Sequence, residues 1–421
     1  MKSFQSIAII NPLADYGINT YCFELAEGLT SAGVRVDLYT GGSTPLSELP
    51  TPQHHRCYRV LGSALFKQRR ILGEADHNVP AEPEAGQLAI PPVNSNLKRR
   101  SVDENSLWGK LRNIFLELEL VVYLKWKRYD LVWTQWPNVY GSSFWRTCRL
   151  LGLRTVHTVH NVLPHEESPG QAQFLRKIYR QTGALVVHSE ASKKDLLRFF
   201  PKSQSKVVVA RHGTYTLYPR NPEAGVTLRD KLNIARGRVA CLLCGAIRPY
   251  KNIDAVLNAL QDKRAAHIVL IVAGQESGYP NSSHTDPLAR TRAMAQKIGV
   301  IDQVRLIPRF LNSTDLATLF EAADILVLPY LKNYGSGLLL LGMTFGKYIL
   351  ATDTGGAGEY LVNYPRHQLL EGPEASHVAE GLSKAVEALS NEDGQVACPE
   401  MPELQWHNIA RNVLPMLMSK F

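Results

Sequence analysis

The chain contains no uncharged apolar run of about 18 residues, the length that a membrane-spanning helix needs. The apolar stretch at residues 7–10 is too short for a signal peptide and predicts a first buried strand. The six cysteines are scattered, and the C-x-x-C pair Cys241 and Cys244 lies inside an apolar run, where cysteines act as small hydrophobic side chains. These absences predict a cytoplasmic protein without a membrane span.

Two common nucleotide-binding motifs are also missing. The sequence has no G-x-x-x-x-G-K-[ST], which argues against a P-loop ATPase, and no G-x-G-x-x-G after the first strand, which argues against a nicotinamide dehydrogenase. The net charge of +9 suits anionic partners such as phosphorylated substrates or acidic lipid. Because no zinc-finger spacing and no aromatic-plus-basic motif accompanies this charge, we expect no nucleic-acid partner.

What the 421 residues do contain is a repeated alternation of apolar runs and helix-like segments, with 45% hydrophobic residues to build a core. Uninterrupted apolar runs indicate strands buried on both faces of a parallel sheet. The alternation occurs twice, on either side of a Pro- and Gly-bearing linker at residues 219–225. We therefore predict an α/β protein with two doubly wound domains, residues 1–217 and 218–405.

One segment departs from this rhythm. Residues 73–105 are rich in Pro, Glu, Asn and Ala, and we expect a flexible insertion there. The segment 105–127 that follows has apolar residues at helical spacing and basic residues crowding its ends. This pattern fits a core helix with solvated ends, and it also fits an interfacial helix that leans on acidic lipid.

Two stretches of the first domain follow predicted strands and so lie where open α/β sheets bind ligands. In residues 11–21, Gly17 precedes a helix and would let a phosphate or sugar approach the backbone, although a plain turn glycine is an equal alternative. Residues 156–167 contain His157, His160, His165 and two glutamates. Their spacing does not match a helical zinc site, and they favour a site that hydrogen-bonds a polyhydroxylated substrate.

Three stretches of the second domain also end predicted strands. Arg248 and Lys251 lie after the run 239–244, where two cations can neutralise a diphosphate, or can be surface charges. The turn Gly335-Ser336-Gly337 precedes an apolar helix and is typical of an anion-binding nest. The glycine-rich residues 351–359 follow the next strand and could meet the same ligand.

The ordered set of these stretches resembles the retaining glycosyltransferases of family four, which have the GT-B fold. The matching pieces are residues 15–21, 158–161, 245–251, 328–330, 335–337 and 352–356. The resemblance implies two Rossmann-like domains with a cleft between them. It also implies a C-terminal helix, residues 406–418, that packs back on the first domain. The closest likeness is to bacterial enzymes of exopolysaccharide and cell-surface glycan pathways.

The resemblance also implies roles for individual residues. A nucleotide-sugar would bind mainly to the second domain, with no metal ion or other cofactor. The implied donor-binding residues are Gly17, Arg248, Lys251, Asn333, Gly335, Ser336 and Gly337. His160 would touch the donor sugar, and Glu166 is the second catalytic candidate. On the acceptor side the residues are Asp15, Asn19 and Asn161.

The predicted function is transfer of a hexose from a UDP- or GDP-sugar to a glycan or a lipid-linked glycan, with retention, by an enzyme that can visit the inner face of the plasma membrane. If the reaction inverts, it needs a base, for which Glu166 or Asp15 is the candidate. Many family members carry two glutamates at the positions of Asn333 and Leu341. Their absence motivates the alternative of an inactive glycosyltransferase-like subunit that binds nucleotide or a partner. Another GT-B activity, such as sugar-nucleotide epimerisation, is a third possibility.

Overall fold

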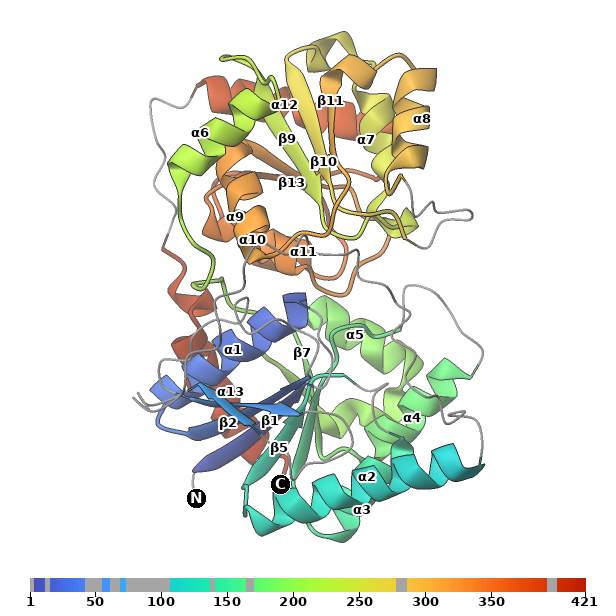
Figure 1. Cartoon of the computed structure of the whole chain (residues 1–421), viewed down its shortest axis with the longest axis vertical. Coiled ribbons are helices and arrows are strands. Elements are labelled where there is room, and N and C mark those ends of the chain that lie inside the picture. The colour runs from blue at the N-terminus through green and yellow to red at the C-terminus, as the bar shows by residue number, and fades with distance from the viewer. Residues whose placement is uncertain are drawn as a thin grey trace, which may run out of the picture.

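The computed structural model describes residues 4–11, 16–41, 55–60, 69–72, 107–136, 141–163, 170–277, 286–391 and 400–421. The insertion expected at residues 73–105 therefore lies outside the described residues. Two parallel sheets, each with helices on both faces, form the two halves of the chain (Figure 1). This architecture confirms the predicted α/β class with two Rossmann-like domains.

The N-terminal sheet has eight strands in the order β4-β3-β2-β1-β5-β6-β7-β8, and only the β3–β4 pair is antiparallel. Its strands are β1 (Ser6–Asn11), β2 (Arg35–Gly41), β3 (Arg56–Val60), β4 (Arg69–Leu72), β5 (Leu131–Thr134), β6 (Thr155–Thr158), β7 (Ala184–Val187) and β8 (Val207–Val209). Its helices are α1 (Tyr16–Ser31), α2 (Leu107–Trp126), α3 (Ser142–Leu150), α4 (Gln171–Gln181) and α5 (Glu190–Phe199). Every residue of β1, β5, β6 and β7 is buried, as the uninterrupted apolar runs predict.

The C-terminal sheet has six parallel strands in the order β11-β10-β9-β12-β13-β14. Its strands are β9 (Val239–Cys244), β10 (Ile268–Ala273), β11 (Val304–Ile307), β12 (Ile325–Leu328), β13 (Tyr348–Thr352) and β14 (His367–Leu370). Its helices are α6 (Pro222–Lys231), α7 (Ile253–Ala259), α8 (Ala289–Lys297), α9 (Ser313–Ala322), α10 (Gly337–Thr344), α11 (Ala357–Leu361) and α12 (Ala375–Ser390). Apolar clusters fill both faces of this sheet, so the strands are held on two sides.

The last helix, α13 (Trp406–Met418), leaves the C-terminal domain and packs against α1 of the N-terminal domain (Figure 1). Its apolar face joins the same cluster as β1 and α1, and the Trp406 indole donates a hydrogen bond of 2.7 Å to the Thr214 carbonyl. A Cβ on Gly28 of α1 would lie 2.6 Å from the Trp406 carbonyl oxygen. Only a glycine therefore permits this close packing of the two helices.

The two domains also touch through the start of α5. The Glu359 carboxylate of α11 accepts hydrogen bonds from the backbone N–H groups of Glu190 and Ala191, at 2.9 and 2.8 Å. The Ser192 hydroxyl donates to the Tyr334 carbonyl at 2.9 Å. A carboxylate is favourable at a helix N-terminus, where the N–H groups have no partner within the helix. These contacts fix one wall of the space between the two sheets.

Candidate active site

A cleft of about 940 Å³ lies between the two domains. Its N-terminal wall is made by residues that follow β5, β6, β7 and β8, together with the start of α1. Its C-terminal wall is made by residues that follow β9, β10, β11 and β12. All these segments leave the carboxyl ends of parallel strands, which is the place where open α/β sheets bind ligands. The volume falls in the usual range for small-molecule sites, about 300–1,000 Å³.

Lys251 lies in the turn after β9 and is the buried cation of the cleft. Its side chain is 4% exposed, and its Nζ donates a hydrogen bond of 2.6 Å to the Cys244 carbonyl. Burial lowers the pKa of this ammonium to about 8. Gly245 has a φ of +88°, and a Cβ there would lie 3.0 Å from the Lys251 Nζ. The glycine thus leaves room for the ammonium beside the strand end.

Arg248, in the same turn, also lines the cleft and is half-buried. The turn Gly335-Ser336-Gly337 reaches the cleft from the end of β12. Ser336 is the N-cap of α10, and its hydroxyl accepts from the Leu339 N–H at 3.3 Å. The open end of α10 therefore faces the same cleft as the two cations, an arrangement that suits an anion such as a diphosphate.

Asn333 and Leu341, the two positions where the family resemblance leads us to expect glutamates, have structural roles. The Asn333 side-chain oxygen accepts from the backbone N–H groups of Tyr334, at 2.9 Å, and Gly335, at 3.4 Å. Asn333 lines the cleft and shapes the glycine turn. Leu341 is 1% exposed and belongs to an apolar cluster, although it also borders the cleft. Neither position supplies a charge to a bound sugar.

His160 lies after β6 and is the histidine of the N-terminal wall that the sequence singled out. Its Nε2 is 3.1 Å from the Gln135 Oε1, and its ring meets the Tyr21 ring edge-on at 4.9 Å. Burial, and then the neighbouring rings of His188 and His212, hold the pKa of His160 well below its usual range. His160 is thus a neutral side chain in the wall of the cleft.

Of the other predicted residues of the N-terminal domain, some line the cleft and one lies inside the domain. Gly17 and Asn161 line the cleft. Asn19 is 3% exposed, and its side-chain oxygen accepts from the Asn11 amide at 2.7 Å and from the Thr40 hydroxyl at 3.0 Å. It therefore ties α1 to β1 and β2 inside the domain. Asp15 and Glu166 lie outside the described residues.

Several residues that the sequence did not single out also line the cleft. His188 follows β7 and His212 follows β8, and both rings pack against Tyr21, at 5.3 and 5.0 Å. Phe310, 59% exposed, lines the cleft after β11. A signal for the two histidines exists in the sequence, because His188 comes directly after the apolar run of β7 and His212 comes shortly after that of β8.

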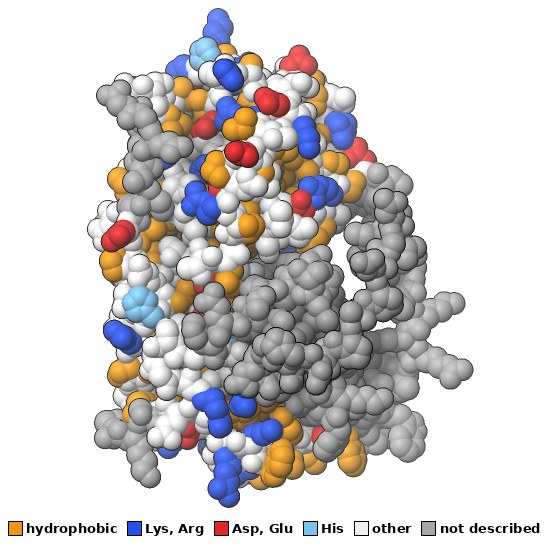
Figure 2. All heavy atoms as spheres, turned by 60° about the vertical axis from the view of Figure 1, so that its left-hand side comes forward, with side chains coloured by type: hydrophobic (Ala, Val, Ile, Leu, Met, Phe, Trp, Pro, Cys, Tyr) orange, Lys and Arg blue, Asp and Glu red, His pale blue; other side chains and the backbone are white. Residues whose placement is uncertain are grey.

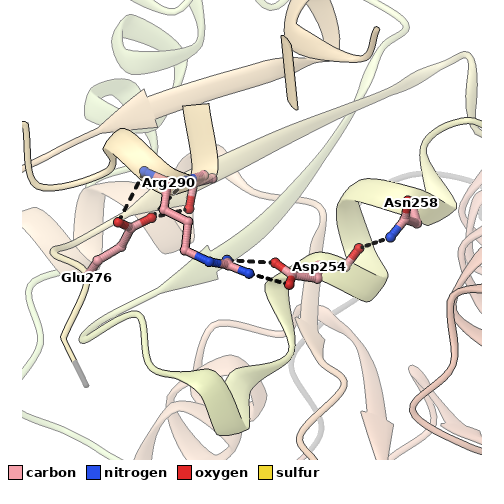
Figure 3. A network of polar contacts seen from close by, with 5 residues as sticks. Asp254, Asn258, Glu276 and Arg290 are labelled. Carbon is pink, nitrogen blue, oxygen red and sulfur yellow. Dashed lines mark hydrogen bonds and ion pairs between the residues drawn. The ribbon is translucent and has the colours of Figure 1, made fainter. Parts of the chain in front are cut away.

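Glu276, after β10, is a carboxylate of the cleft wall that the sequence also did not single out. Its oxygens accept from the backbone N–H groups of Arg290, at 3.3 Å, and Thr291, at 2.8 Å, at the start of α8 (Figure 3). The Arg290 guanidinium turns the other way and pairs with both oxygens of Asp254 on α7. Glu276 thus anchors the strand end to α8.

The described residues show neither a metal-binding cluster nor a membrane-spanning helix. No group of three or more His, Cys, Asp or Glu side chains in this part of the chain is arranged to hold a metal ion. No helix among the same residues is both long and apolar enough to cross a membrane.

Comparisons with known proteins agree with this geometry. The model of the Glycosyltransferase Family 4 domain matches residues 16–216, and that of the Glycosyl transferases group 1 domain matches residues 227–393. A D-inositol 3-phosphate glycosyltransferase of Streptomyces scabiei is 25% identical over 358 residues, which are 81% of this chain and 72% of that protein. A GDP-mannose:glycolipid 4-beta-D-mannosyltransferase of Xanthomonas campestris is 24% identical over 249 residues, 57% of this chain and 63% of its own.

Solved structures show the same fold. HepE of Anabaena, in complex with UDP and glucose, superposes with a TM-score of 0.63 at 14% identity and covers 99% of this chain and 97% of its own. Sucrose-phosphate synthase of Thermosynechococcus elongatus has a TM-score of 0.61 at 18% identity, with 99% and 95% covered.

Two Rossmann-like domains that face each other across a cleft with buried and half-buried cations define a GT-B glycosyltransferase. The chain belongs to glycosyltransferase family four, since the two domain models match it in order, on either side of residues 217–226.

Proposed function

We propose that the enzyme transfers a hexose from a UDP- or GDP-sugar to a glycan or lipid-linked glycan in polysaccharide biosynthesis, with retention of the anomeric configuration. One observation carries this proposal: Lys251, Arg248 and the N-terminus of α10 line the same cleft, and a Cβ on Gly245 would lie 3.0 Å from the Lys251 Nζ and 3.7 Å from the Leu338 side chain of α10. Negative charge grows on the departing diphosphate in the transition state, so cations and amides held there in advance lower the barrier. In this proposal they act without a metal ion.

Retention is supported by the chemistry of the cleft wall. An inverting reaction needs a base to take the proton of the acceptor hydroxyl, whereas in a retaining reaction the leaving phosphate can take it. The one carboxylate among the described cleft-lining residues, Glu276, already accepts hydrogen bonds from the start of α8. Inversion remains the alternative, with Asp15 or Glu166 as the base. The NMR spectrum of the product's anomeric proton distinguishes the two outcomes.

The proposal is tested with a panel of UDP- and GDP-sugars. We expect UDP or GDP to raise the melting temperature and one nucleotide-sugar to be consumed in the presence of EDTA, with product mass giving the acceptor. If no nucleotide shifts the melting temperature, the proposal that the cleft binds a nucleotide-sugar donor is wrong. The lack of carboxylates at Asn333 and Leu341 favours a second candidate, a subunit that binds nucleotide without turnover. Turnover that disappears in His160→Ala would exclude that candidate.

We also propose that the enzyme docks on the acidic inner face of the plasma membrane through α2 and the end of α3. Phe115, Val122 and Trp126 project from one side of α2 and are 74%, 52% and 70% exposed, and Leu150 at the end of α3 is 75% exposed. Exposed basic side chains surround this apolar stripe: Lys125, Lys127, Arg128, Arg146 and Arg149. The end of the molecule that carries α2 and α3 in Figure 1 shows Lys and Arg beside hydrophobic side chains in Figure 2. Apolar residues ringed by cations match an anionic lipid surface.

Sedimentation with phosphatidylglycerol vesicles at low salt tests this surface. We expect the double variant Phe115→Ser, Trp126→Ser to bind at least about tenfold more weakly, because burying each aromatic side chain contributes roughly 1.5–3 kcal/mol. The matched control is Val226→Ser, Val362→Ser, which removes two exposed apolar residues from the C-terminal domain. Equal binding by both double variants would exclude the α2 surface as the membrane contact. A wild-type protein that does not bind the vesicles would exclude it as well.

A further inference from the structure

The cleft wall is rich in histidine and poor in carboxylate. Four histidines line it, at positions 157, 160, 188 and 212, against one carboxylate among the described lining residues, Glu276. Both Glu276 oxygens already accept hydrogen bonds from the first turn of α8, which makes this carboxylate a weaker acceptor for a sugar hydroxyl. A donor sugar bound here therefore needs other acceptors.

His188 has such an acceptor in a fixed tautomer. Its Nδ1 is 2.9 Å from the Ala210 carbonyl, which can only accept, so Nδ1 carries the proton. Burial keeps the ring neutral by lowering its pKa to about 4. The Nε2 therefore presents a bare lone pair. This atom is buried and has no hydrogen-bond partner among the described residues, on a side chain of a residue that is 4% exposed.

Gln135 presents the complementary group. Its Oε1 accepts from the Nε2 of His160 at 3.1 Å, and the residue is fully buried. Its amide Nε2 carries two N–H donors and, within the described part of the chain, has no hydrogen-bond partner. A buried polar atom without a partner destabilises the protein, which points to a ligand that completes it.

The sheet places these groups in a row. Gln135, His160 and His188 follow β5, β6 and β7, which are neighbours in the strand order. The rings of His160 and His188 are 5.6 Å apart. The His188 carbonyl accepts from the Tyr360 hydroxyl of the C-terminal domain at 2.7 Å, so this end of the row lies against the donor half of the cleft.

We propose that His188 Nε2 accepts, and Gln135 Nε2 donates, hydrogen bonds to hydroxyls of the transferred sugar on either side of His160. The row thus supplies recognition of the transferred sugar's hydroxyls, which one of the two missing glutamates would otherwise provide. This inference rests on the proposed function, since it takes the occupant to be the sugar of a nucleotide-sugar donor.

Calorimetry with the free nucleoside diphosphate and with the nucleotide-sugar separates the inference from the function it rests on. In His188→Phe we expect the affinity for the nucleotide-sugar to fall about 10- to 100-fold and the affinity for UDP or GDP to stay unchanged. Gln135→Glu, which keeps the oxygen facing His160 and removes the N–H donors, should show the same split. If neither UDP nor GDP binds the wild type, the proposed function fails instead.

A set of donors with single hydroxyls replaced by fluorine gives the second readout. Fluorine cannot donate, so the wild type should discriminate against one of these donors by about tenfold or more, and His188→Phe should lose that discrimination. A merely structural histidine would leave the pattern of discrimination intact. The inference is overturned if the pattern survives in folded His188→Phe, or if nucleotide and nucleotide-sugar affinities fall together in both variants, since the two atoms then serve only buried water or packing.

Discussion

Replacing Lys251 by methionine lowers the rate of transfer at least about a hundredfold and leaves the melting temperature unchanged or raised. Lys251 is the buried cation of the cleft, and its ammonium is placed to meet the charge that develops on the leaving diphosphate. Its folded-state pKa of about 8 lies below the usual lysine value of 10.5, so below pH 8 the folded protein keeps a charge in a place that disfavours it. Methionine removes that cost together with the charge. Steady-state kinetics and thermal unfolding measure the two effects.

Lys297→Met provides the control, because Lys297 is exposed on α8 and outside the cleft. It should leave the rate at the wild-type value. A diphosphate would raise the pKa of Lys251, so binding of UDP or GDP should take up a proton above about pH 8 and weaken as pH rises further. If Lys251→Met keeps its rate, the diphosphate binds elsewhere. If it loses its rate because it unfolds, the role of the lysine is structural.

The histidine wall makes the protein sensitive to mild acid. Burial lowers the pKa of His157, His188 and His212 to about 3, 4 and 3, from the usual histidine value of 6.5. A folded-state pKa below the unfolded value means that the unfolded chain takes up protons first as pH falls. The stabilisation is therefore complete above about pH 6.5 and is lost as pH falls from there toward 4. Between pH 6.5 and 5 each ring contributes a loss of up to about 2 kcal/mol.

Urea unfolding at a series of pH values measures this loss. The slope of the free energy of unfolding against pH gives the difference in bound protons between the two states, and we expect it to rise toward about three, one for each ring, as pH approaches 5. His267→Asn is the control, because His267 is exposed, and it should leave the slope unchanged. A free energy that stays level from pH 6.5 to 5 would mean that the rings exchange protons with solvent in the folded protein.

The positions of the cleft residues could be predicted from sequence wherever they depend on the ends of strands. Lys251 and Gly337 lie in the turns that follow the apolar runs of β9 and β12, and the carboxyl ends of parallel strands meet at one edge of a sheet, so their common place in the cleft follows from the β-α-β order. The same reasoning applied to every run would have found His188 and His212. These two were missed because a single histidine after a strand carries no motif.

Side-chain direction could not be predicted in the same way. Asn19 follows β1 as a ligand-binding residue would, yet its oxygen is taken up by Asn11 and Thr40 inside the domain. Glu359 lies in the glycine-rich stretch that was expected to meet the ligand, but its carboxylate caps α5 of the other domain. Both outcomes depend on partners far away in the sequence or on the inward face of a helix, which local spacing does not reveal.

The return of α13 to the N-terminal domain bears on the order in which the chain matures during synthesis. Trp406 lies 5.2 Å from the Tyr21 ring and 5.4 Å from the His212 ring, so part of the wall behind the cleft comes from the end of the chain. Domains generally fold in the order in which the ribosome makes them. Here the first domain can gain its last helix only after the second has been made. A nascent chain halted before residue 406 would carry a finished donor half beside an N-terminal half with an exposed apolar face on α1, and that intermediate is where a chaperone would be needed.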